Sequence, residues 1–109
     1  MVNGQRMVKP AEVTPLNAHV YRVFNVFDRL YQFGATDYFA RFQGVDEGYR
    51  IFSEALRGLT TEQVNLGIRR VEGLENRKLV FPEARAFFNL CIWNDQEFSE
   101  QLWRYEEKN

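Results

Sequence analysis

Few side chains in this sequence have the chemistry that catalysis requires, and none lies at a spacing typical of a catalytic group. His19 is the only histidine and Cys91 is the only cysteine. A nucleophile needs a base within hydrogen-bond reach, and His19 has no cysteine, serine or pair of carboxylates in register with it. We therefore expect His19 to pack at the edge of a helix. We expect Cys91, in a phenylalanine-rich segment, to be a small buried hydrophobe.

The carboxylate pairs do not favour an enzyme either, and the sequence lacks the common cofactor motifs. Asp46 and Glu47 are adjacent, as are Glu106 and Glu107. Neighbouring residues on a helix point in different directions, so these pairs are expected to be solvated surface groups. The sequence has no glycine-rich nucleotide motif, no phosphate-binding lysine motif, no HExxH motif and no Cys/His cluster that could hold zinc. It therefore predicts a non-enzymatic protein without a cofactor or a metal.

Basic residues are the better candidates for binding. Arg69 and Arg70 lie beyond the apolar stripe of a predicted helix, near its C-terminal end, where the helix dipole favours positive charge. They are candidates for a polar anchor on a partner protein or a phosphate, and Arg77 with Lys78 would extend that patch. The alternative is that they complement the dipole and form surface salt bridges. The carboxylates available for such pairs are those of Asp46, Glu62 and Glu72.

The two tryptophans are further candidates for partner binding. Trp93 and Trp103 flank the last predicted turn and helix, and tryptophan is enriched at binding hot spots. A predicted cap at Asn94 and Asp95 breaks the helix between them. Core packing is the alternative for at least one of the two rings.

The elements that position these residues are predicted to be helices. Apolar residues recur at three- and four-residue spacing from about Pro15 onward, which is typical of an amphipathic helix, and Gly34 is expected to end it. A short helix over 35–44 should place its aromatic side chains in the core. A second main helix is predicted from about Asp46 to Arg57. The aromatics expected in the core from the short helix are Tyr38, Phe39 and Phe42.

The second half of the chain has clearer helix signals. Thr60-Thr61-Glu62-Gln63 is a capping-box pattern that starts a helix over 61–72, and Gly67 in its middle suggests the close approach of another helix. A linker over 74–81 and a helix over 82–93 follow. A last helix is expected after Asn94, with one apolar and one acidic side. Its apolar side comprises Phe98, Leu102 and Tyr105, and its exposed acidic residues are Glu97, Glu100, Glu106 and Glu107.

No segment alternates polar and apolar residues with period two, so the predicted fold class is all-α. We expect a compact bundle of about four to five short helices. Residues 1–13 are predicted to be a flexible N-terminal arm, and residues 14–109 a single helical domain.

Composition excludes several function classes. The 14 basic and 15 acidic residues give a net charge of -1, so direct binding of duplex DNA is not expected. One cysteine cannot form an intramolecular disulfide, and no apolar run is long enough for a membrane span or a signal peptide. We expect a cytoplasmic protein. Aromatic residues make up 16% of the chain, which is enough to leave an apolar patch for a partner.

The order and spacing of motifs in the middle of the chain resemble a known family. Residues 60–65 (TTEQVN), followed by Gly67 and Arg69, resemble the helical heart of the phage lambda P-type replication proteins. After a linker with Asn76-Arg77, a helix starts at Phe81-Pro82 and carries Phe87 and, four residues on, Cys91, as in the family. The resemblance covers roughly residues 20 to 92. Glu83, Ala84 and Leu90 depart from the family's pattern.

This resemblance implies a role in DNA replication. P-type proteins deliver the bacterial replicative helicase to an origin, so it implies a phage or mobile-element adaptor that binds that helicase or an initiator. The alternative is a homodimeric helical interaction module of a mobile element, without a replication role.

Overall fold

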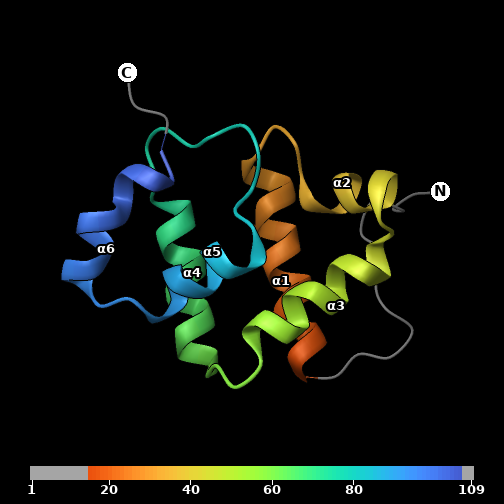
Figure 1. The fold of residues 1–109 in the computed structure, drawn as a ribbon, viewed down its shortest axis with the longest axis horizontal. Coiled ribbons are helices and arrows are strands. Elements are labelled where there is room, and N and C mark those ends of the chain that lie inside the picture. Colours follow the sequence, from red (N-terminus) through yellow and green to blue (C-terminus); the bar gives the residue numbers. More distant parts are fainter. Residues whose placement is uncertain (1–14, 107–109) are drawn as a thin grey trace.

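The computed structural model describes residues 15–106, and these residues fold as helices joined by short connections (Figure 1). The predicted arm over 1–13 and the predicted exposure of Glu107 lie outside the described residues. The all-α prediction is confirmed, although the described part has six α-helices rather than four to five. The helices are α1 Pro15–Leu30, α2 Ala35–Phe42, α3 Val45–Leu56, α4 Thr61–Glu72, α5 Ala84–Ile92 and α6 Asp95–Gln101, and the last is followed by a 3₁₀ helix, Leu102–Arg104.

Helix α1 is central, because α2, α3 and α4 all pack against it. Helix α5 packs against both α4 and α3, so that α1, α3, α4 and α5 enclose one core. Helix α6 and its 3₁₀ extension lie at one end of the molecule, and α2 lies toward the other (Figure 1). None of the helices in the described part combines the length and the apolar character needed to cross a bilayer.

Aromatic rings fill the centre of the core. Phe27 of α1 is fully buried, and its ring centroid lies 6.0 Å from that of Phe52, 5.4 Å from Phe81 and 5.5 Å from Phe87. These contacts join α1 to α3, to the linker and to α5. Each buried phenylalanine stabilises the fold by about 1.5–3 kcal/mol through the apolar area removed from water. The linker is therefore part of the core, through Phe81.

Side-chain caps fix where α4 and α6 begin. The Thr60 hydroxyl accepts the Gln63 N–H (3.1 Å), and the Gln63 side chain accepts the Thr60 N–H (2.8 Å), so the predicted capping box is confirmed. Asn94 and Glu97 form the same arrangement at the start of α6. Each cap satisfies backbone donors that would otherwise lack a partner at a helix start.

The turn between α1 and α2 differs from the prediction. Helix α1 ends at Leu30, and Gly34 is the N-cap of α2 rather than the end of the first helix. Because glycine has no side-chain cap, Asp28 supplies the acceptor: it binds the Thr36 N–H (2.9 Å) and hydroxyl (2.6 Å). A Cβ built on Gly34 would lie 2.6 Å from Asp28 Oδ1, so only glycine admits this contact.

The end of the described chain is held more tightly than expected. Glu106 was predicted to be exposed, but it is buried and its carboxylate accepts the Glu75 N–H at 2.8 Å. The backbone of Glu106 also forms an isolated antiparallel bridge with Arg77. The Tyr105 hydroxyl donates to the Ala86 carbonyl at 3.1 Å. These contacts bind the segment after α6 to the linker and to α5.

Gly67 sets the distance between α4 and α5, as its position in the sequence suggested. A Cβ built on this residue would lie 2.5 Å from Cys91 Sγ and 3.1 Å from Phe87 Cζ. Both neighbours are buried, so neither can move into solvent.

We expect Gly67→Ala to destabilise the protein by about 1 kcal/mol, because overpacking costs about 1–3 kcal/mol and the gain in helix propensity offsets about 1 kcal/mol. In a Cys91→Ala background the same substitution should cost less, because the closest contact atom is gone. A urea-unfolding double-mutant cycle measures this coupling. Equal costs in the two backgrounds would contradict the proposed contact.

Candidate partner-binding surface

The structure separates the six residues that the sequence suggested for partner binding. Arg70 and Arg77 bind backbone carbonyls within the molecule, and Trp93 is half-buried. Arg69, Lys78 and Trp103 are exposed. Of these three, only Lys78 and Trp103 lie together.

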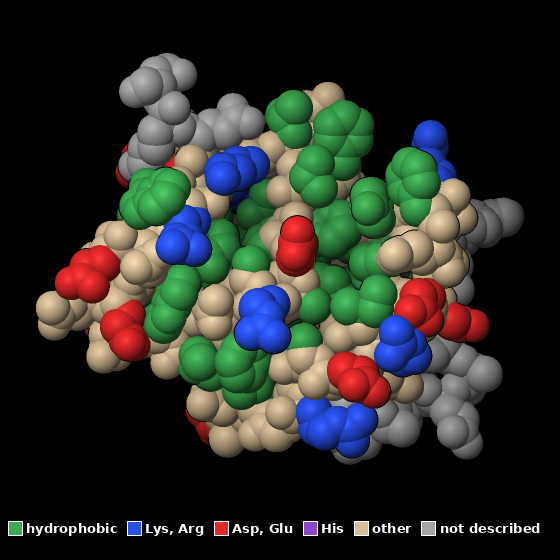
Figure 2. Space-filling view, viewed as in Figure 1, with side chains coloured by type: hydrophobic (Ala, Val, Ile, Leu, Met, Phe, Trp, Pro, Cys, Tyr) green, Lys and Arg blue, Asp and Glu red, His purple; other side chains and the backbone are tan. Residues whose placement is uncertain are grey.

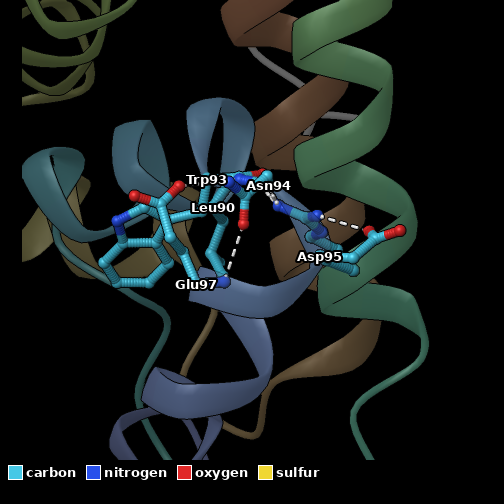
Figure 3. A network of polar contacts seen from close by, with 6 residues as sticks. Leu90, Trp93, Asn94, Asp95 and Glu97 are labelled. Atoms are coloured by element: carbon cyan, nitrogen blue, oxygen red, sulfur yellow. Dashed lines mark hydrogen bonds and ion pairs between the residues drawn. The ribbon is translucent and has the colours of Figure 1, made fainter.

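Arg70 is buried at the junction of α4, α5 and α6, where it contacts Leu90, Trp93 and Asp95, three residues labelled in Figure 3. Its guanidinium donates to the Leu90 carbonyl (2.9 Å) and the Trp93 carbonyl (2.7 Å), and it pairs with the exposed Asp95 carboxylate (3.1 Å). The guanidinium carbon also lies 4.6 Å from the centre of the Phe98 ring. The prediction that Arg70 lies on an exposed face beside Arg69 is therefore wrong, because the end of α5 needs its donors.

A signal for this role was present in the sequence. Val64, Gly67 and Val71 mark the buried stripe of α4, and Arg70 lies three residues after Gly67 and directly before Val71. Residues three positions apart share a helix face, so Arg70 lies on the same face as Gly67. An arginine on the buried stripe indicates a guanidinium whose N–H groups donate to acceptors inside the protein.

Arg77 has a similar internal role at the end of α4. It donates to the Leu74 carbonyl at 2.8 Å, and to the Val71 and Glu72 carbonyls at 3.4 and 3.5 Å. These acceptors lie at and just after the last turn, where carbonyls lack helical partners and positive charge is favoured. Arg77 therefore closes the end of α4 and does not extend a surface patch.

The two tryptophans have different environments. Trp93 is half-buried against the core, and its ring meets that of Tyr105 edge-on at 6.1 Å. Trp103 is 60% exposed, on the 3₁₀ helix after α6. Trp103 is therefore the tryptophan that is available to a partner.

Lys78 and Trp103 line one shallow hollow on the surface, of about 340 Å³. Its lining brings together the linker, α5 and the 3₁₀ helix. We call it the basic groove, and it is lined by Lys78, Glu83, Arg85, Ala86, Asn89, Trp103, Arg104 and Tyr105. Arg69 lies in a different hollow, between α4 and α6, beside Leu66, Phe98 and Leu102.

A patch of large apolar side chains is the main feature that the sequence did not locate. Tyr38 and Phe42 were expected in the core, but they are 39% and 69% exposed, and of the three aromatic residues in α2 only Phe39 is buried. Phe33 and Val80 line one hollow with them, and Leu79 precedes Val80 in the chain and accepts the Phe33 N–H; these three side chains are 49–50% exposed. We call these five residues the apolar patch. Hydrophobic side chains gather over the α1–α2 turn and α2 in Figure 2.

The backbone joins the two segments that build the apolar patch. The Phe33 N–H donates to the Leu79 carbonyl at 3.2 Å, and Phe33 and Val80 form an isolated parallel bridge. Hollows of about 460 and 500 Å³ lie on either side of Tyr38 and Val80, which line both. The hollow of about 500 Å³ shares Glu83 and Arg85 with the basic groove, so the apolar patch and the basic groove are continuous.

The two groups considered for catalysis differ in burial, because His19 is half-buried and Cys91 is fully buried. Burial, and then the Arg22 guanidinium, lower the pKa of His19, whose Nδ1 lies 3.1 Å from Arg22 Nη1. Burial raises the pKa of the Cys91 thiol to about 12. Among residues 15–106, no cluster of three His, Cys, Asp or Glu side chains has the arrangement of a metal site.

Comparisons with known proteins do not add a function. No family model, curated protein or solved structure matches the chain. The resemblance to P-type replication proteins therefore stays a prediction that rests on the motifs quoted above.

We expect Arg70→Ala to lower the free energy of unfolding by about 2–4 kcal/mol, because two carbonyls at the end of α5 lose their charged donor. Arg69→Ala, on the same helix but exposed, should change it by less than about 0.5 kcal/mol. Chemical denaturation of both variants measures the difference. Equal effects would contradict the internal role of Arg70.

Cys91 should react slowly with thiol reagents in the folded protein. The thiolate is the reactive form, and with its pKa raised to about 12 from an ordinary value of 9.0 the thiol stays protonated at pH 8. We expect modification at pH 8 to be on the order of a hundredfold to a thousandfold slower than in denaturant. The folded rate should rise with pH up to about 12. A colorimetric disulfide reagent follows both rates, and equal rates would show that the thiol is accessible and ionised.

Proposed function

We propose that this chain is a non-enzymatic adaptor that acts by binding another protein through the apolar patch. The observation that carries the proposal is the exposure of five large apolar side chains, each 39–69% accessible, four of which line two adjoining hollows. Monomeric proteins rarely leave such a contiguous apolar surface uncovered, and aromatic side chains are enriched where partners bind. The two hollows offer places for a partner's anchor residues.

The proposed partner is a bacterial replicative helicase or a replication initiator. This choice rests on the resemblance of segment 60–65, Gly67, Phe87 and Cys91 to the P-type replication proteins. Within the proposal, the chain belongs to a phage or another mobile element and works in the cytoplasm. The interior positions of Gly67, Phe87 and Cys91 mean that these motifs support the scaffold, and the apolar patch supplies the contact.

A second candidate is a homodimer in which the apolar patch covers its own copy. Two-fold symmetric interfaces use the same patch on both subunits, and homodimer interfaces are more apolar than other protein surfaces. Light scattering over a range of concentrations distinguishes the candidates. A monomer at all concentrations removes the homodimer, and a dimer that Phe42→Ser dissociates supports it.

The double variant Phe42→Ser/Val80→Ser tests the adaptor proposal. These side chains are 69% and 49% exposed, so their replacement should leave the free energy of unfolding within about 1 kcal/mol of the parent. Binding to purified replicative helicase or initiator, measured by interferometry, should weaken at least about thirtyfold, because hot-spot residues contribute about 2 kcal/mol or more.

Ile92→Ser is the matched control, because Ile92 is 43% exposed but lies outside the apolar patch. It should bind as the parent does. Absence of binding by the parent to both purified proteins would remove the replication partner. Unchanged binding by the double variant would show that the partner does not bind through the apolar patch.

A further inference from the structure

The basic groove brings together cations that no carboxylate among residues 15–106 pairs with. Arg29, Arg50 and Arg57 elsewhere on the surface each pair with a glutamate. In contrast, Lys78 and Arg85 form no hydrogen bond or ion pair with another residue in the described part of the chain.

Arg104 adds a third cation to the same lining, and its guanidinium lies over an aromatic ring. Among the described residues that line the groove, Glu83 is the one carboxylate. Three positive charges and one negative charge therefore meet in a chain whose net charge is -1.

An exposed indole lies in the same lining. Trp103 is 60% exposed, and the Arg104 guanidinium carbon lies 5.4 Å from its ring centre. An arginine over the ring uses one face and orients the side chain, while most of the indole stays in contact with water. Tyr105 does not compete for a ligand, because it is buried and its hydroxyl is bound to the Ala86 carbonyl.

Cations that track phosphates, together with an exposed aromatic platform, are the two parts of a single-strand binding site. In duplex DNA the flat faces of the bases are stacked on each other, so an exposed indole has nothing to stack on. An acidic peptide would use the cations but would leave the indole without a matching group. Asn89 adds an amide that can hydrogen-bond to a base or a sugar.

We propose that the basic groove binds single-stranded nucleic acid, with phosphates on Lys78, Arg85 and Arg104 and one base stacked on Trp103. The shallow groove and the few cations predict weak binding without sequence preference, with a Kd on the order of 10⁻⁵ M at low salt. This site adjoins the apolar patch, but none of the five patch residues lines it. The inference does not depend on the identity of the protein partner.

The direct test uses a fluorescein-labelled short oligothymidylate and fluorescence anisotropy with the full chain. Trp103→Ala should weaken binding about tenfold, because stacking a base on an aromatic side chain is worth about that factor. Trp103→Phe should restore part of the loss. Lys78→Glu/Arg85→Glu should abolish measurable binding. Circular dichroism checks that each variant stays folded.

Arg69→Ala and Arg41→Ala are the matched controls. Both side chains are exposed cations outside the basic groove, so their loss should leave binding within about twofold of the parent. The salt dependence gives an independent measure. With three phosphates contacted, log Kd should change with log salt by a slope of about 2, and Lys78→Ala should reduce that slope by about 0.7.

Two outcomes would overturn the proposal. If polyglutamate displaces the oligonucleotide efficiently and Trp103→Ala has no effect, the groove is a general polyanion surface. If a duplex of the same length binds as well as the single strand, base stacking is not the mode of recognition. Phe42→Ser/Val80→Ser should bind the oligonucleotide as the parent does, so failure here is distinguishable from failure of the adaptor proposal.

Discussion

The C-terminal end of α5 is the point on which the arrangement of the other elements depends. The Leu90 carbonyl is bonded in the interior and the Trp93 carbonyl at a partly buried site, and the Arg70 guanidinium donates to both. The same side chain reaches Asp95 at the start of α6, so one residue of α4 joins the end of α5 to the start of α6. Gly67, one turn earlier, brings the two helices close enough for this contact. The position of the 3₁₀ helix, and of Trp103 on it, follows from this junction.

The apolar patch follows from how the chain distributes its aromatic residues. Phe27 and its neighbours already fill the space between α1, α3 and α5. Helix α2 is only eight residues long and turns one aromatic residue, Phe39, toward that space. Tyr38 and Phe42 remain outside, where Tyr38 meets Phe81 edge-on at 5.5 Å and joins the surface to the core. Tyr38 is therefore held against a buried ring, which reduces the side-chain ordering that the proposed partner binding would require.

Local signals in the sequence predicted the fold class, the capping box at Thr60 and the close packing at Gly67. Each of these depends on residues within a few positions of one another. The candidate surfaces depend on contacts between distant segments, such as Phe33 with Leu79 and Lys78 with Trp103, and no local pattern carries that information. Arg70 is an intermediate case, because its place on the buried stripe was readable but its carbonyl partners on α5 were not.

The segment over 77–80 has an irregular conformation, yet both of its ends are fixed. Arg77 is bridged to Glu106 and Val80 to Phe33, while Lys78 between them faces the basic groove and Leu79 belongs to the apolar patch. An inserted or deleted residue here would move one surface relative to the other. Among homologous sequences, length should therefore vary less in this loop than loops usually allow, although the identities of its side chains remain free to change. The two surfaces thus share one backbone segment, and the length of that segment fixes the distance between them.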